Sequence, residues 1–145
     1  MDGSLNRMFL DTFTHALDDK DRVSVPSKYK KVLTELSPDD EAKYTLVLTA
    51  EEDKCITVYP GNAYEEFSKK FLESKEWDKS KQDRDQIRRK GGYSKIVKID
   101  KAGRIIIPKN LKGYAEIDKD VVFVGVYDRF EIWGKEKYEK EYGKI

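Results

Sequence analysis

Cysteine, histidine and long apolar runs are scarce in this chain of 145 residues. Cys55 is the only cysteine, so no internal disulfide can form, which suits a reducing compartment. His15 is the only histidine, so neither a zinc cluster nor a Cys–His catalytic pair is indicated, and there is no glycine-rich phosphate loop. No apolar run is long enough for a membrane span or a signal-peptide core. We therefore expect a cytoplasmic protein with no metal, cofactor, small-molecule substrate, membrane association or enzymatic activity.

Net charge is also small, at +1, although 39% of the residues are charged. The charges are unevenly distributed. Between Lys79 and Arg104 the sequence has ten basic and three acidic residues, whereas between Glu35 and Asp53 it has seven acidic residues and one lysine. A basic segment of this kind can mark a nucleic-acid-binding surface, although most such runs are solvated helix faces.

The chain contains an internal repeat. Residues 17–29 align with residues 99–111 at an offset of 82 without a gap, and each copy reads as an apolar residue, Asp-x-x-x-Arg, a β-branched run and a proline. Further along, residues 53–59 resemble residues 128–133 with one residue of slippage. Two copies of one β-rich half are therefore predicted.

Each half has the same local plan. A strand ends near Leu17 or Ile99, and a tight connection follows, rich in aspartate or containing glycine. The β-branched residues predict second strands at 22–25 and 104–107, which end at prolines that can also open helices, Pro26 and Pro108. Further strands are predicted at 45–49, 55–59, 121–126 and 130–133, and a helix after Pro26.

A helical insert is predicted between the halves. Its first helix has an apolar stripe (Tyr64, Phe67, Phe71 and Leu72), and a basic helix follows from about Asp78 to Lys90. We expect Gly91-Gly92 to stop that helix before a strand at 93–99. The predicted organisation is a tag or alternative start at 1–7, a first repeat at 8–60, the insert at 61–92 and a second repeat at 93–145. Because neither half can bury a core alone, we expect a mainly β, α+β fold in which two pseudo-symmetric halves form a shared β-barrel.

The sequence resembles the MraZ family over nearly its whole length. The resemblance rests on Met8-Phe9-Leu10, His15 to Pro26, Asp100 to Pro108 and Phe130-Glu131-Ile132-Trp133. Each half is similar to the swapped-hairpin domain of SpoVT and AbrB regulators. The resemblance implies a nucleoid-associated transcription regulator that binds short promoter repeats in double-stranded DNA. It also implies a ring-shaped homo-oligomer that usually represses the division and cell-wall gene cluster, including its own gene.

The resemblance also implies a set of DNA-contacting residues. The motif arginines, Arg22 and Arg104, would reach the DNA, because a planar guanidinium can bind a phosphate or a guanine edge with two hydrogen bonds. The motif carboxylates, Asp18 and Asp100, would hold the turns and aim the arginines, and four flanking lysines would contact phosphates (Lys20, Lys28, Lys101 and Lys109).

Alternatives remain open at this point. The aspartates and arginines can pair across the turns without touching DNA, and the lysines can serve solubility alone. One departure bears on this choice: Asp21 stands where glycine is common, which adds a negative charge beside Arg22 and removes a residue that tolerates positive φ. A rival reading is a protein-binding or antitoxin-type module.

Overall fold

The computed structural model describes residues 5–37 and 39–144. The strands are β1 (Thr12–Ala16), β2 (Arg22–Ser24), β3 (Thr45–Ala50), β4 (Ile56–Pro60), β5 (Lys95–Lys98), β6 (Arg104–Ile106), β7 (Asp120–Gly125) and β8 (Phe130–Gly134). The helices are α1 (Ser27–Leu36), α2 (Asp40–Lys43), α3 (Gly61–Ser74), α4 (Lys81–Tyr93), α5 (Lys109–Tyr114) and α6 (Lys135–Tyr142), with short 3-10 helices η1 (Leu5–Arg7) and η2 (Glu76–Asp78). Of the expected tag or alternative start, residues 1–4 lie outside the described residues.

The main sheet has a palindromic strand order, β1-β7-β8-β4-β3-β5, and every pairing in it is antiparallel. At its centre β4 pairs with β8, where Ile56 faces Ile132 and Val58 faces Phe130. On either side, β1 of the first half pairs with β7 of the second, and β5 of the second half pairs with β3 of the first. The two halves therefore share one sheet with an approximate two-fold axis through its middle.

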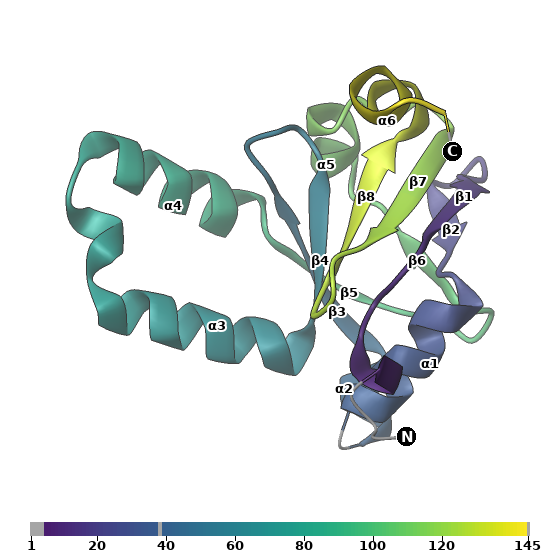
Figure 1. Cartoon of the computed structure of the whole chain (residues 1–145), viewed down its shortest axis with the longest axis horizontal. Helices are drawn as coiled ribbons and strands as arrows, with labels where there is room; N and C mark the ends of the chain where they lie inside the picture. The colour runs from purple at the N-terminus through teal and green to yellow at the C-terminus, as the bar shows by residue number, and fades with distance from the viewer. Residues whose placement is uncertain (1–4, 38, 145) are drawn as a thin grey trace.

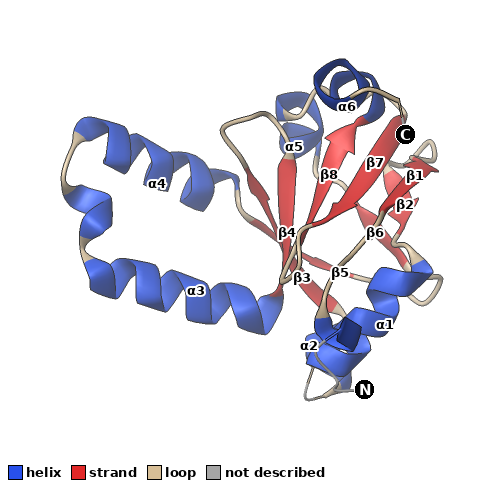
Figure 2. Ribbon diagram, in the orientation of Figure 1, coloured by secondary structure: helices blue, strands red, loops and turns tan. Residues whose placement is uncertain are grey.

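The expected closed barrel is wrong. The six-stranded sheet is open, with β1 and β5 as its edge strands, and the fold is mixed α and β (Figure 2). The sheet does not close because the chain leaves each edge strand through a tight turn into β2 or β6. These two short strands pair with each other as a separate two-stranded ribbon. The swapped-hairpin connection stays a prediction.

The hydrophobic core draws on both halves. Tyr29, which is fully buried, lies 4.7 Å from Phe130 and 6.2 Å from Phe123 between ring centroids. Pro26 and Pro108 end their strands and precede α1 and α5, as the sequence predicts, because proline fits the start of a helix and not a strand interior. The core thus fixes the ends of β2 and β6, from which the two tight turns extend.

The insert forms an arm of α3, η2 and α4 that projects from the sheet (Figure 1). The predicted stop at Gly91-Gly92 is wrong, because both glycines lie inside α4 and the helix ends at Tyr93. Glycine weakens a helix but ends it only where the chain turns away. Here the helix end is held by contacts: the Lys90 carbonyl accepts from the hydroxyls of Thr49 and Ser94, and Tyr93 packs on Tyr114.

Candidate nucleic-acid interface

The first Asp-x-x-x-Arg turn joins β1 to β2 and is closed by one carboxylate. Oδ1 of Asp18 accepts from the main-chain N–H groups of Lys20 and Arg22, both at 2.9 Å, and Oδ2 accepts from Nε of Arg22 at 2.8 Å. The pKa of Asp18 falls from 3.8 to about 2, first because the main-chain N–H of Arg22 donates to it and then because the Arg22 guanidinium does. The ionised carboxylate fixes Nε of Arg22, and among the described residues no hydrogen bond engages the terminal nitrogens of that guanidinium.

The second turn, between β5 and β6, repeats this arrangement. Oδ1 of Asp100 accepts from the main-chain N–H groups of Ala102 and Arg104, both at 2.9 Å, and Oδ2 accepts from Nε of Arg104 at 3.3 Å. The pKa of Asp100 is also lowered, chiefly by the hydrogen bond from the Arg104 main chain. Gly103 has φ +80° and Asp21, at the equivalent position, has φ +60°, so both turns need a left-handed residue and Asp21 supplies one.

The ribbon brings the two turns together from distant parts of the sequence. Val23 faces Ile105 in its register, and both side chains are 1% exposed. Since side chains alternate along a strand, Arg22 and Arg104 project from the opposite face. Nη1 of Arg104 also lies 3.8 Å from Oδ2 of Asp18, so the two arginines form one cluster with the motif carboxylates.

Two hydrogen bonds related by the same offset of 82 lock each turn to the other half. The N–H of Val25 donates to the carbonyl of Gly103 at 3.0 Å, and the N–H of Ile107 donates to the carbonyl of Asp21 at 2.9 Å. Each turn is therefore positioned by the strand of the opposite copy.

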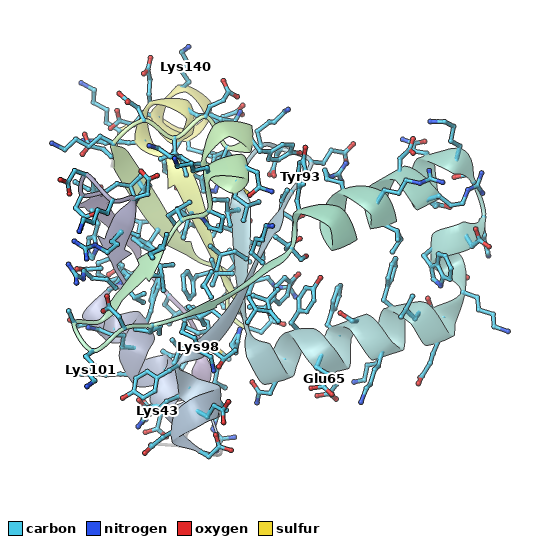
Figure 3. The ribbon with its side chains drawn as sticks, turned by 180° about the vertical axis from the view of Figure 1, so that it is seen from behind. Lys43, Glu65, Tyr93, Lys98, Lys101 and Lys140 are labelled. Carbon is cyan, nitrogen blue, oxygen red and sulfur yellow. The ribbon has the colours of Figure 1, made fainter. Side chains whose placement is uncertain are left out.

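The four flanking lysines are all exposed. Lys20 and Lys101 lie on the turns themselves, and Figure 3 shows Lys101 pointing away from the body of the protein. Lys28 and Lys109 lie in the first turns of α1 and α5. Nζ of Lys28 is 3.7 Å from a carboxylate oxygen of Asp11, an exposed pair that contributes little to stability.

Sequence reasoning missed two further lysines beside the turns, Lys30 on α1 and Lys112 on α5. Nζ of Lys112 lies 2.9 Å from Oδ1 of Asp21, and a Cβ atom built on Gly103 would lie 2.5 Å from Nζ of Lys30. Lys30 and Lys112 are also 82 residues apart, so extending the repeat alignment by one residue would have found them.

The basic segment of the sequence does not form one surface. Its helical part lies on the arm, and the arm projects from the end of the molecule opposite to β2 and β6 (Figure 1). There Asp85 accepts from Lys81 at 2.7 Å and from Arg88 at 2.9 Å. Arg84 also pairs with Asp78 of η2 at 3.8 Å, and Nζ of Lys90 lies 4.0 Å from a carboxylate oxygen of Glu51, so most basic side chains of α4 already have an acidic partner.

The single histidine and cysteine occupy structural positions. Nδ1 of His15 lies 2.6 Å from the carbonyl oxygen of Ser24, and Cys55 is fully buried, which raises the pKa of its thiol. No group of three or more His, Cys, Asp or Glu side chains suited to a metal ion is found within 5–37 and 39–144. Across the same ranges, no helix combines the length and apolarity needed to cross a bilayer.

Comparison with known proteins gives a consistent result. The chain matches the family model MraZ, described as "MraZ protein, putative antitoxin-like", over residues 8–88 and 94–145. It is 36% identical to the transcriptional regulator MraZ of Lachnoclostridium phytofermentans and 38% identical to that of Natranaerobius thermophilus, each match covering 91% of this chain and 85% of the relative. It is 35% identical to the transcriptional regulator MraZ of Clostridium tetani over 92% of this chain and 86% of that protein.

Proposed function

This chain belongs to the MraZ family, and from that membership we propose that it is a transcriptional regulator that binds double-stranded DNA through its two Asp-x-x-x-Arg turns. The bases or phosphates are contacted by Arg22 and Arg104, with Lys20, Lys28, Lys101 and Lys109 adding phosphate contacts. The protein has no catalytic role and needs no cofactor.

One observation carries the proposal: two sequence-distant arginines project from the same face of the β2·β6 ribbon, each held at Nε by its own carboxylate. Holding Nε fixes the direction of the guanidinium before DNA arrives, which lowers the conformational entropy lost on binding. A two-stranded ribbon is also narrow enough to approach a major groove. The Asp–Arg pairs and the DNA contacts are therefore compatible, since Nε makes the hydrogen bond to the carboxylate in each turn and the terminal nitrogens can turn to the DNA.

The family resemblance supplies the finer part of the proposal. The DNA sites are short repeats upstream of the division and cell-wall gene cluster, which includes the protein's own gene, and binding represses that cluster. The protein acts in the cytoplasm on the nucleoid, as a ring-shaped homo-oligomer whose subunits engage several repeats at once. Such linkage raises affinity through effective concentration without new contacts.

Apolar side chains on the arm support self-association. On α3, Leu72 is 52% exposed and Phe67 is 38% exposed, and Ile96 on the edge strand β5 is 74% exposed. Exposed apolar groups of this kind favour a protein–protein contact. Because the arm lies at the end opposite to the ribbon, copies can meet there without covering the turns (Figure 1).

The DNA-binding proposal is tested by titrating the protein against the duplex upstream of its own gene and against a shuffled duplex. We expect Arg104→Ala to weaken binding to the promoter duplex about tenfold, corresponding to about 1–3 kcal/mol for a lost arginine contact, while native mass spectrometry gives an unchanged assembly. Arg88→Ala is the matched control, because it removes an arginine from the arm. Equal affinity for the two duplexes, or equal effects of the two substitutions, would refute the assignment.

A second candidate is an interaction module for another protein, which the family description and the apolar arm favour. A footprint on the promoter separates the two functions. A protected site within the repeats supports the DNA-binding function. Its absence at low salt, together with an intact assembly, supports the protein-binding function.

A further inference from the structure

The two turns have nearly identical backbones but unequal surroundings. Lys30 and Lys112 hold equivalent places on α1 and α5, and each lies beside the turn of the opposite half. Lys112 forms an ion pair with Asp21, whereas Gly103 has no side chain to offer Lys30. Within residues 5–37 and 39–144, no carboxylate oxygen lies within 4.0 Å of Nζ of Lys30. One lysine is therefore neutralised and its counterpart is not.

The hollows beside the two turns differ in charge accordingly. The hollow at the second turn, about 510 Å³ in volume, is lined by Lys30, Lys101 and one aspartate among its charged residues, a net charge of +1. The equivalent hollow at the first turn, about 330 Å³ in volume, is lined by four aspartates and two lysines, a net charge of −2. Asp21, and Asp19 at the position equivalent to Lys101, account for the reversal in sign.

We propose that the hollow at the second turn is a phosphate-binding site, in which Lys30, lying over Gly103, and Lys101 hold a phosphate of the DNA backbone. At the first turn, the ion pair between Asp21 and Lys112 neutralises the lysine of the equivalent hollow, which therefore does not attract a phosphate. This inference rests on the proposed DNA-binding function and adds that the two halves of a subunit contribute unequally to it. Each subunit therefore binds a backbone phosphate in the hollow of its second turn and only weakly in that of its first, although both turns carry a motif arginine.

The chemistry of a phosphate explains why the residue at position 21 or 103 matters. A phosphate oxygen needs a nearby cation, and Gly103 leaves room for one because a Cβ there would lie only 2.5 Å from Nζ of Lys30. An aspartate at the same place puts a negative charge against the phosphate and engages the lysine that would attract it. Lys112 is therefore a structural residue at the first turn, and Lys30 is a binding residue at the second.

The salt dependence of DNA binding measures this difference. The logarithm of affinity falls linearly with the logarithm of salt concentration, and each phosphate contact makes that slope steeper by about 0.9. Lys30→Gln should make the slope shallower by about 0.9 for each engaged subunit, so the ratio of affinities at 50 and 200 mM salt falls about 3.5-fold for each. Asp21→Asn frees Lys112 and should make the slope steeper by about the same amount.

The double variant Asp21→Asn/Lys112→Gln is the matched control, because it removes the pair without changing net charge and should return the slope to the wild-type value. Asparagine at 21 tolerates the left-handed backbone, so the turn keeps its shape. A wild-type slope for Lys30→Gln, or no increase for Asp21→Asn, would overturn the inference while wild-type DNA binding stands. Failure of the wild-type protein to bind the promoter duplex would instead refute the proposed function itself.

Discussion

Replacing Ile105 with alanine should destabilise the protein by about 3 kcal/mol. Ile105 is 1% exposed and faces Val23 beneath the ribbon that carries both turns. The substitution removes three buried carbons, about 2.4 kcal/mol at about 0.8 kcal/mol each, and the space left behind raises the loss to about 3 kcal/mol. For a chain of 145 residues, with an unfolding entropy of about 2.1 cal/mol/K per residue, the melting temperature should fall by about 10 °C.

The control lies one residue away. Ile106 is in the same strand but is 57% exposed, so Ile106→Ala should change the free energy of unfolding by no more than about 0.5 kcal/mol. Urea and thermal unfolding of both variants at one protein concentration measure the difference. Similar losses for the two variants, or a loss below about 1 kcal/mol for Ile105→Ala, would refute the placement of the ribbon on the core.

Lower pH should destabilise both turns, because folding lowers the pKa values of Asp18 and Asp100. Their stabilisation is complete well above pH 4 and is lost as the pH falls, toward about 2 in the case of Asp18. Asp18→Asn should flatten the dependence of the urea midpoint on pH over that range, and an unchanged dependence would count against the hydrogen bonds described. Gly125→Ala should cost at least about 2 kcal/mol, because its Cβ would lie 2.5 Å from a main-chain oxygen, whereas Gly92→Ala should stabilise α4 by about 0.5–1 kcal/mol, since nothing lies within 4 Å of its Cβ. Tyr29→Phe should cost about 1 kcal/mol by calorimetry, because the hydroxyl donates to a main-chain carbonyl at 2.7 Å.

The sequence alone predicts much of the local structure. The β-branched runs mark β2 and β6, and Pro26 and Pro108 mark their ends, because proline restricts the backbone wherever it stands. The repeat offset of 82 likewise anticipates two turns of one design. These features depend on neighbouring residues and are visible without the rest of the fold.

Closure of the sheet and the end of α4 depend on distant contacts, and the sequence predicts them poorly. Whether β1 and β5 meet is decided by where the chain goes after the turns, which no local pattern encodes. The glycine pair in α4 is a weak helix-stop signal. It is overridden by the hydroxyls of Thr49 in β3 and of Ser94, the residue after α4, which donate hydrogen bonds to the Lys90 carbonyl.

The candidate site is predictable only in part, because some of its contacts are local in the sequence and others are not. Asp18 and Asp100 form hydrogen bonds within their own turns, so the motif reveals them. Lys112 meets Asp21 across 91 residues, a contact that only the three-dimensional structure brings together. The sequence shows an aspartate at position 21 where the second copy has a glycine, and the structure shows that Lys112 forms an ion pair with it.

Joining both halves in one polypeptide changes what mutation can do to them. In a dimer of two identical short chains, any substitution in the gene appears in both subunits, so the two subunits cannot come to differ in sequence. Here the sheet keeps the geometry of such a pair, yet residues 21 and 103 are encoded separately and differ, as aspartate and glycine. Two covalently linked halves can therefore carry different residues at equivalent positions. Such a difference would let the protein distinguish the two directions along an asymmetric DNA site.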